Sequence, residues 1–304
     1  MMTILKGVVV PIVTPLKRGN QDKIDEDGVE KLCNFLISKG IQGLFPCGTT
    51  GEGFLLLKET RKELASLVVK KTRGRVPVVI QTGCINTKST IELTKHARDV
   101  GADGAAIVSP FFYRYSLDDL KDHFVTVAKS VPDFPIYLYN IPDNTNNDIT
   151  PELLKSIIDE ANNVVGIKYS HFDLRRIPEY LGYLGENRAF LTGVDELVYP
   201  SYMLGACGCV AGNANVFPEP FVRLYDAFLK GDYIEAKRQQ DLIIKIAHTL
   251  KRGAHLCYYK MALQFRGVEV GDVVSPQKRL NKEEITDLYR KLKSLGLPLE
   301  NPIC

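Results

Sequence analysis

The stretch Asn163-Val164-Val165-Gly166-Ile167-Lys168-Tyr169-Ser170 contains a short apolar run, and Lys168 closes that run. Apolar, partly β-branched residues without polar alternation predict a β-strand buried on both faces, as in a parallel sheet. An ammonium at the buried end of such a strand loses its hydration, which disfavours the charged form. The neutral amine is a nucleophile that can form a Schiff base with a ketone. The alternative is a lysine whose side chain extends from the strand end into solvent.

Seven further strand-like runs accompany this one, and amphipathic helical patterns separate them. The eight predicted strands lie near residues 8–13, 44–47, 76–81, 104–109, 136–139, 164–168, 189–192 and 208–211. Eight β-α alternations over about 220 residues favour a (β/α)₈ TIM barrel, which typically needs roughly 250. A doubly wound α/β sheet is the competing fold, and the absence of a Gly-x-Gly-x-x-Gly motif after the first strand disfavours it.

After about residue 216 the pattern becomes wholly helical. Helices are predicted near 218–229, 234–252, 256–265 and 282–295. We therefore expect an α/β TIM barrel with a C-terminal helical extension. The predicted division places the barrel and its active site in residues 1–225 and a helical domain in residues 226–304.

Composition excludes several classes of function. The net charge of +3 and the lack of a dense Lys/Arg stripe give no argument for nucleic-acid binding. No apolar stretch approaches the roughly 18 residues that cross a bilayer, so no membrane partner is expected. Seven cysteines without a regular framework and an N-terminus unlike a signal peptide predict a cytoplasmic protein. Five scattered histidines make no H-x-x-x-H pattern, so no metal site is expected.

Three groups fall at the predicted carboxyl ends of strands, where TIM-barrel enzymes carry their catalytic residues. Lys168 ends the sixth strand, Tyr139 ends the fifth, and Gly48-Thr49-Thr50-Gly51-Glu52 follows the second. Schiff-base chemistry needs an amine, a proton shuttle and a group that holds the carboxylate of a keto acid. The Gly48–Gly51 turn could supply backbone N–H groups and hydroxyls for that carboxylate. Taken singly, the turn could be a capped strand–helix loop and the tyrosine an ordinary core residue.

Together with Tyr139-Asn140-Ile141-Pro142 and Gly166-Ile167-Lys168, the Gly48–Glu52 motif resembles the dihydrodipicolinate synthase / N-acetylneuraminate lyase superfamily of class I aldolases. The resemblance spans nearly the whole chain. Its flanking segments are Pro11-Ile12-Val13-Thr14-Pro15, Val108-Ser109-Pro110-Phe111-Phe112, Gly193-Val194-Asp195-Glu196, Gly205-Ala206-Cys207-Gly208 and Ala214-Asn215-Val216.

The resemblance implies a role for each matching residue. Lys168 matches the lysine that forms a Schiff base with pyruvate, and Tyr139 matches the proton-transferring tyrosine. Thr49 and Thr50 match the pair that holds the pyruvate carboxylate, with Thr50 also in the proton relay. Val210 matches a residue lining the pyruvate pocket. The family's substrates are 2-oxo acids, it uses no metal or organic cofactor, and its members are usually homotetramers.

The chain departs from dihydrodipicolinate synthases at two places. Their Tyr-Asn-x-Pro motif is followed two residues later by an arginine that binds the aldehyde's carboxylate, and Asn144 stands there. An amide cannot replace the guanidinium fork unless another cation, such as Arg114 or Lys88, compensates. The tyrosine that those enzymes donate across a subunit interface matches Phe112, and Tyr113 stands beside it.

Another segment resembles the sugar-binding part of sialic acid lyases. Gly193, Asp195 and Glu196 lie in that segment, where carboxylates accept hydrogen bonds from sugar hydroxyls. The alternative is that Asp195 caps the following helix. Asn144 could add a further contact to hydroxyls.

We therefore predict a carbon–carbon lyase that reversibly cleaves a 2-keto-3-deoxy sugar acid to pyruvate and a hydroxyaldehyde such as glyceraldehyde. The spacing of Pro142 and Thr145 resembles 2-keto-3-deoxygluconate aldolases. N-acetylneuraminate lyase and 4-hydroxy-tetrahydrodipicolinate synthase are alternatives, and a non-catalytic keto-acid sensor is a third.

Overall fold

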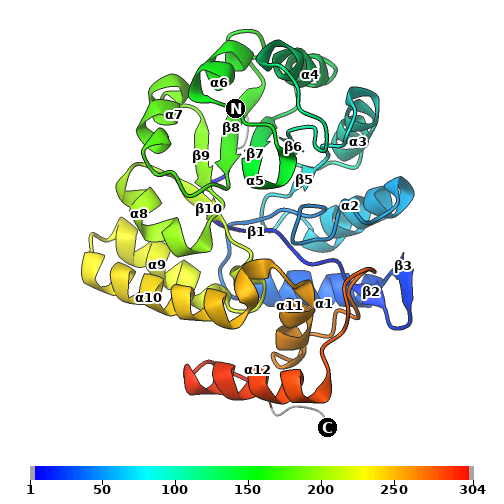
Figure 1. The fold of residues 1–304 in the computed structure, drawn as a ribbon, viewed down its shortest axis with the longest axis vertical. Coiled ribbons are helices and arrows are strands. Elements are labelled where there is room, and N and C mark those ends of the chain that lie inside the picture. The colour runs from blue at the N-terminus through cyan, green and yellow to red at the C-terminus, as the bar shows by residue number, and fades with distance from the viewer. Residues whose placement is uncertain (1–3, 301–304) are drawn as a thin grey trace.

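A computed structural model describes residues 4–300, in which eight parallel strands form a barrel (Figure 1). Neighbours follow the order β4-β1-β10-β9-β8-β7-β6-β5, and a parallel bridge between Leu44 and Val78 closes the ring. The strands are β1 (Gly7–Val10), β4 (Gly43–Leu44), β5 (Val79–Gln81), β6 (Gly104–Val108), β7 (Ile136–Asn140), β8 (Val164–Tyr169), β9 (Ala189–Thr192) and β10 (Gly208–Val210). Each overlaps one of the eight predicted runs, so the TIM-barrel prediction is confirmed.

Helices surround the strands on the outside of the barrel (Figure 1). They are α1 (Glu26–Ser38), α2 (Lys58–Thr72), α3 (Thr87–Asp99), α4 (Leu117–Lys129), α6 (Pro151–Ile158), α7 (Arg176–Leu184), α8 (Val198–Met203) and α9 (Pro218–Leu229). Their starts follow local chemistry. Ser116 and Asp119 form a capping box at the start of α4, and Pro151 occupies the first turn of α6, where its missing N–H costs nothing.

The barrel strands bury both faces, as their continuous apolar runs predict. In β7, Tyr137 and Tyr139 belong to the apolar cluster inside the barrel, whereas Ile136 and Leu138 belong to the cluster between barrel and helices. Gly166 allows β8 to approach β9, since a Cβ there would lie 2.6 Å from the Ala189 carbonyl oxygen.

The chain beyond α9 is helical, as predicted, with α10 (Tyr233–Thr249), α11 (Leu256–Gln264) and α12 (Lys282–Ser294). A short 3₁₀ turn, η3 (Lys251–Gly253), joins α10 to α11. The predicted boundary at residue 225 falls inside α9, and the division into two units stays a prediction. Among the described residues, no helix combines the length and apolarity that crossing a membrane requires.

Candidate active site

Adjacent strands place Tyr139 and Lys168 side by side at the carboxyl end of the barrel. The two residues are register partners in β7 and β8 and are only 2% and 4% exposed. The Lys168 Nζ lies 3.9 Å from the centre of the Tyr139 ring and 4.8 Å from that of Phe45. Within residues 4–300 no carboxylate pairs with this amine. The lysine therefore turns inward against aromatic rings and does not extend into bulk solvent.

The loop after β4 brings a threonine to the tyrosine. The Thr49 Oγ1 lies 3.2 Å from the Tyr139 hydroxyl, within hydrogen-bond reach. The loop is tightly wound, because the Gly53 amide donates to the Gly48 carbonyl at 3.0 Å and a Cβ on Gly53 would lie 1.9 Å from the Cys47 carbonyl oxygen.

The sequence analysis placed Thr50 in the proton relay with Tyr139, and that role stays a prediction, but the structure brings the other threonine of the pair to the tyrosine. Thr49, and not Thr50, carries the hydroxyl that contacts Tyr139. The Thr50 hydroxyl faces Gly212 instead, where a Cβ would lie 3.5 Å from it. Successive residues of a turn point in different directions, so sequence alone could not decide between two adjacent threonines.

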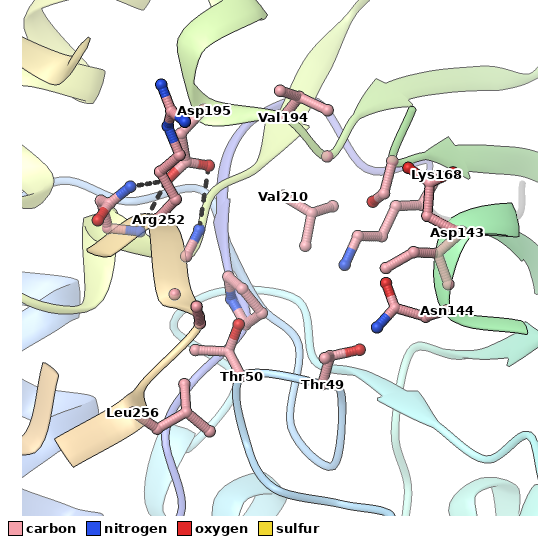
Figure 2. A pocket seen from close by; sticks show the side chains of 18 of the residues that line it. Thr49, Thr50, Asp143, Asn144, Lys168, Val194, Asp195, Val210, Arg252 and Leu256 are labelled. Atoms are coloured by element: carbon pink, nitrogen blue, oxygen red, sulfur yellow. Dashed lines mark hydrogen bonds between the residues drawn. The ribbon is translucent and has the colours of Figure 1, made fainter. Parts of the chain in front are cut away.

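A cavity of about 470 Å³ opens at this end of the barrel (Figure 2). Every residue predicted to belong to the site lines it: Thr49, Thr50, Tyr139, Asn144, Lys168, Gly193, Asp195, Glu196 and Val210. Figure 2 shows Lys168 and Thr49 pointing toward a common space beside Val210 and Asn144. The structure thus brings the predicted residues together, while their individual roles remain predictions.

Gly193 leaves room for a hydroxyl beside the lysine. A Cβ at this position would lie 1.9 Å from the Ser170 Oγ and 3.1 Å from the Lys168 Cε. The Ser170 Oγ is buried, lines the cavity and has no hydrogen-bond partner among the described residues. A buried hydroxyl without a partner is costly unless a ligand or water satisfies it.

The carboxylate of Asp195 accepts its hydrogen bonds from other groups of the protein. Its carboxylate accepts from the Asn213 backbone N–H at 2.8 Å, from the Asn213 Nδ2 at 2.6 Å and from the Gly212 N–H at 3.2 Å. It makes no capping bond to its own helix, so the capping alternative is wrong. Burial raises the pKa of this carboxyl to about 6, while the Asn213 donors act in the opposite direction.

The Asp195→Asn variant tests the raised pKa. The folded value, about 6, lies above the usual 3.8, so the folded chain binds a proton in this window that the unfolded chain does not. The unfolding free energy of the unmodified protein, relative to the variant, should therefore fall by about 2 kcal/mol as the pH rises from about 4 to about 7. Urea unfolding of both proteins measures this difference. The contributions of the other carboxylates to the pH dependence are the same in both proteins and cancel in the difference. A difference that does not vary with pH would contradict the shift.

A cation that the sequence analysis missed stands at the mouth of the cavity. The Arg252 Nε lies 2.9 Å from the Glu196 Oε1, and its Nη2 lies 2.8 Å from the His248 Nε2. Arg252 belongs to η3, where its φ is 51° and that of Lys251 is 57°. This left-handed turn places the guanidinium over a site 84 residues from Lys168 in the chain. Only Gly253 hinted at a break between the two helices.

The proposed compensating cations lie elsewhere, since neither Arg114 nor Lys88 lines the cavity. Asn144 lies in α5 (Pro142–Thr145), a single turn that the sequence analysis did not predict. Phe112 and Tyr113 are 75% and 60% exposed and stack edge-to-face with each other at 5.1 Å, away from the cavity. Their role at a subunit interface stays a prediction.

No cluster of three or more metal-ligating His, Cys, Asp or Glu side chains occurs in residues 4–300. The expected independence from metals and organic cofactors is not tested by this observation. The residues assembled around Lys168 are instead an amine, hydroxyls and amides, which fit nucleophilic and proton-transfer chemistry on a small ligand.

Known proteins are similar to this chain over nearly its whole length. An uncharacterised DapA-like lyase of Halobacterium salinarum is 34% identical over 293 residues, which cover 96% of this chain and 95% of that protein. The crystal structure of dihydrodipicolinate synthase from Aquifex aeolicus superposes with a TM-score of 0.91 at 32% identity and covers 98% of this chain and 100% of that one. The structure of YagE, an E. coli K12 prophage protein in complex with pyruvate, gives 0.92 at 30% identity, over 97% and 100%.

The dihydrodipicolinate synthetase family matches residues 4–295, which is nearly the whole chain. The resemblance drawn from the ordered motifs is therefore confirmed at the level of the superfamily. The chain belongs to the dihydrodipicolinate synthetase family of pyruvate-dependent class I aldolases and is a carbon–carbon lyase.

Proposed function

We propose that Lys168 is the Schiff-base residue of this lyase. Its Nζ attacks the C2 ketone of a 2-oxo acid, and the resulting carbinolamine loses water to give a protonated imine. Tyr139, hydrogen-bonded to Thr49, moves the protons of this step. Both side chains are buried in contact with each other, which supports the assignment. The related YagE has been crystallised with pyruvate.

The protonated imine then acts as an electron sink for carbon–carbon cleavage. Tyr139 takes the proton of the C4 hydroxyl, the C3–C4 bond breaks to release an aldehyde, and its electrons form an enamine. Protonation at C3 and hydrolysis of the imine return pyruvate and free Lys168. Thr49 and Thr50 hold the carboxylate in this scheme, and Val210 packs beside the methyl end of pyruvate.

We propose that the substrate is a 2-keto-3-deoxy sugar acid of the 2-keto-3-deoxygluconate type. The observation that most directly supports this proposal is the Glu196–Arg252 ion pair at the mouth of the cavity. Besides Lys168, Arg252 is the only lysine or arginine lining the cavity within the described residues, and its charge is already balanced. With Asn144 in place of an arginine, a second carboxylate would meet no free cation.

The same lining suits hydroxyl groups. Ser170 offers an unpartnered hydroxyl, Asn144 offers an amide, and the second oxygen of Glu196 can accept. Asp195 supports this wall indirectly, because its carboxylate fixes Asn213 and Gly212. A polyhydroxylated tail can exchange hydrogen bonds with each of these groups without burying a charge.

A panel of aldehydes tests the substrate class. Pyruvate with glyceraldehyde should give a condensation product, and 2-keto-3-deoxygluconate should be cleaved to the same pair. Aspartate semialdehyde should react far more slowly, because its carboxylate finds no unpaired cation. A preference for aspartate semialdehyde would favour 4-hydroxy-tetrahydrodipicolinate synthase, and a preference for N-acetylneuraminate would favour the lyase of that sugar. Pyruvate binding without turnover of any partner would favour a sensor.

Glu196→Gln should weaken discrimination between these aldehydes. The change removes an acceptor for hydroxyls and leaves the Arg252 guanidinium without its counter-charge. We expect kcat/KM for the sugar acid to fall about tenfold, equivalent to roughly 1.4 kcal/mol, and the rate with acidic aldehydes to rise. Asp241→Asn, which breaks the exposed Lys237–Asp241 pair on α10, is the matched control. Unchanged selectivity in Glu196→Gln would remove this residue from the specificity account.

The predicted homotetramer also remains part of this proposal. It derives from the resemblance to the family. Sedimentation of the purified protein over a range of concentrations tests it directly.

A further inference from the structure

The loop after β4 that carries Thr49 and Thr50, the catalytic loop, also contains a buried carboxylate that does not line the cavity. Glu52 follows the Thr49-Thr50-Gly51 segment and is 3% exposed, with a left-handed φ of 56°. Its amide donates to the Thr49 carbonyl at 3.1 Å, so the position of Glu52 is tied to that of the threonine. A buried carboxylate is costly without partners, which directs attention to what holds it.

The partners of Glu52 come from the C-terminal extension. The Lys260 Nζ on α11 lies 2.6 Å from the Glu52 Oε2, and both side chains are essentially excluded from solvent. The Val274 amide donates to the Glu52 Oε1 at 2.6 Å, and Lys260 also donates to the Asp272 carbonyl at 2.5 Å. The two bonds of the Glu52 carboxylate, to Lys260 and to Val274, connect segments more than 200 residues apart in the chain.

The neighbouring residue of α11, Tyr259, contacts a second loop that lines the cavity. The Tyr259 hydroxyl donates to the Asn213 Oδ1 at 2.9 Å, and Asn213 in turn donates to Asp195. Tyr259 is 2% exposed and lines the cavity, whereas Lys260 does not line it. Two consecutive residues of one helix thus hold two separate loops of the site.

We infer that α11 is a positioning element of the active site, in which Lys260, acting through Glu52, sets the placement of Thr49 and Thr50 for the substrate carboxylate. The role is indirect, because Lys260 touches the loop and not the cavity. It goes beyond the choice of aldehyde and rests on the proposed roles of Lys168 in forming the imine and of Thr49 and Thr50 in binding the pyruvate carboxylate. A misplacement of about 1 Å at a reacting centre can cost on the order of 10²-fold in rate.

The test compares Lys260→Met with Arg266→Met in the full-length protein. Arg266, shortly after α11, pairs with Glu219 at 2.5 Å and its side chain is 5% exposed, but it does not contact the catalytic loop. The readout is the pyruvate concentration that gives half the maximal rate of borohydride trapping, which needs no aldehyde. We expect this concentration to rise about 10- to 100-fold in Lys260→Met and to stay within twofold of the unmodified value in Arg266→Met.

A double variant keeps the test informative if Lys260→Met does not fold. Glu52→Gln combined with Lys260→Met leaves no unpaired buried charge, and the same rise is expected from it. Half-saturation within twofold of the unmodified protein in either folded variant would overturn the inference. An equal rise in Arg266→Met would also overturn it, because the effect would then be a general loss of stability. A failure to react with the predicted aldehyde leaves this pyruvate-only readout unaffected.

Discussion

Replacing Lys168 by alanine should reduce turnover by on the order of 10⁴-fold or more. No other lysine lines the cavity among the described residues, so no second amine is placed to form the imine. Without the imine, the electrons released from the C3–C4 bond have no sink. Steady-state kinetics of pyruvate release, with single-turnover measurements to exclude trace contamination, provide the check.

Two controls sharpen this result. Lys155→Ala removes an exposed lysine of α6 that pairs with Asp159, and full activity is expected from it. Lys168→Ala should also bind pyruvate weakly and reversibly if the remaining pocket is intact. Activity of Lys168→Ala within tenfold of the unmodified enzyme would show that the amine is not the nucleophile.

Replacing Tyr139 by phenylalanine should lower kcat by about 10²–10⁴-fold, the range for a general acid–base group. The phenyl ring keeps the packing against Phe45 and Lys168, while the hydroxyl 3.2 Å from the Thr49 Oγ1 is lost. The expected decrease in kcat therefore comes from slower proton transfer, while the folded structure is retained. Measurement of kcat and of unfolding temperature on the same preparation separates the two.

Tyr137→Phe is the matched control for this variant. Tyr137 also lies inside the barrel, two residues earlier in β7, and its hydroxyl accepts from the Leu5 amide at 2.9 Å. Loss of this hydroxyl should lower the stability of the protein and leave kcat nearly unchanged.

Thr49→Val should share part of the Tyr139→Phe defect, and Thr50→Val should raise KM for pyruvate more than it lowers kcat. Full activity in Tyr139→Phe would assign proton transfer to another group.

Much of the fold was predictable because the barrel strands are buried on both faces. Continuous apolar runs, as in Val164–Ile167, predict such strands wherever they occur. The hairpin of β2 (Leu16–Lys17) and β3 (Asn20–Ile24) was not predicted, because its second strand, Asn-Gln-Asp-Lys-Ile, is polar and largely exposed. The α5 turn was missed because four residues are too few to establish a helical period.

Only the site residues that lie at the ends of strands had positions that the sequence could predict. Lys168 and Tyr139 meet because parallel neighbours bring their carboxyl ends to one edge, which topology alone implies. Which of the two threonines contacts Tyr139 depends on side-chain directions within a tight turn, and the sequence does not show these directions. The position of the Arg252 side chain at the site depends on how the helical extension folds back over the barrel. No local sequence pattern predicts that position.

The most direct test of the account is borohydride reduction in the presence of pyruvate, followed by mass mapping of the modified peptide. The account predicts a single reduced pyruvate adduct, carried by Lys168, and loss of activity in proportion to its formation. An adduct on a different lysine would contradict the assignment. Pyruvate binding shown by calorimetry without any adduct would contradict the Schiff-base mechanism itself.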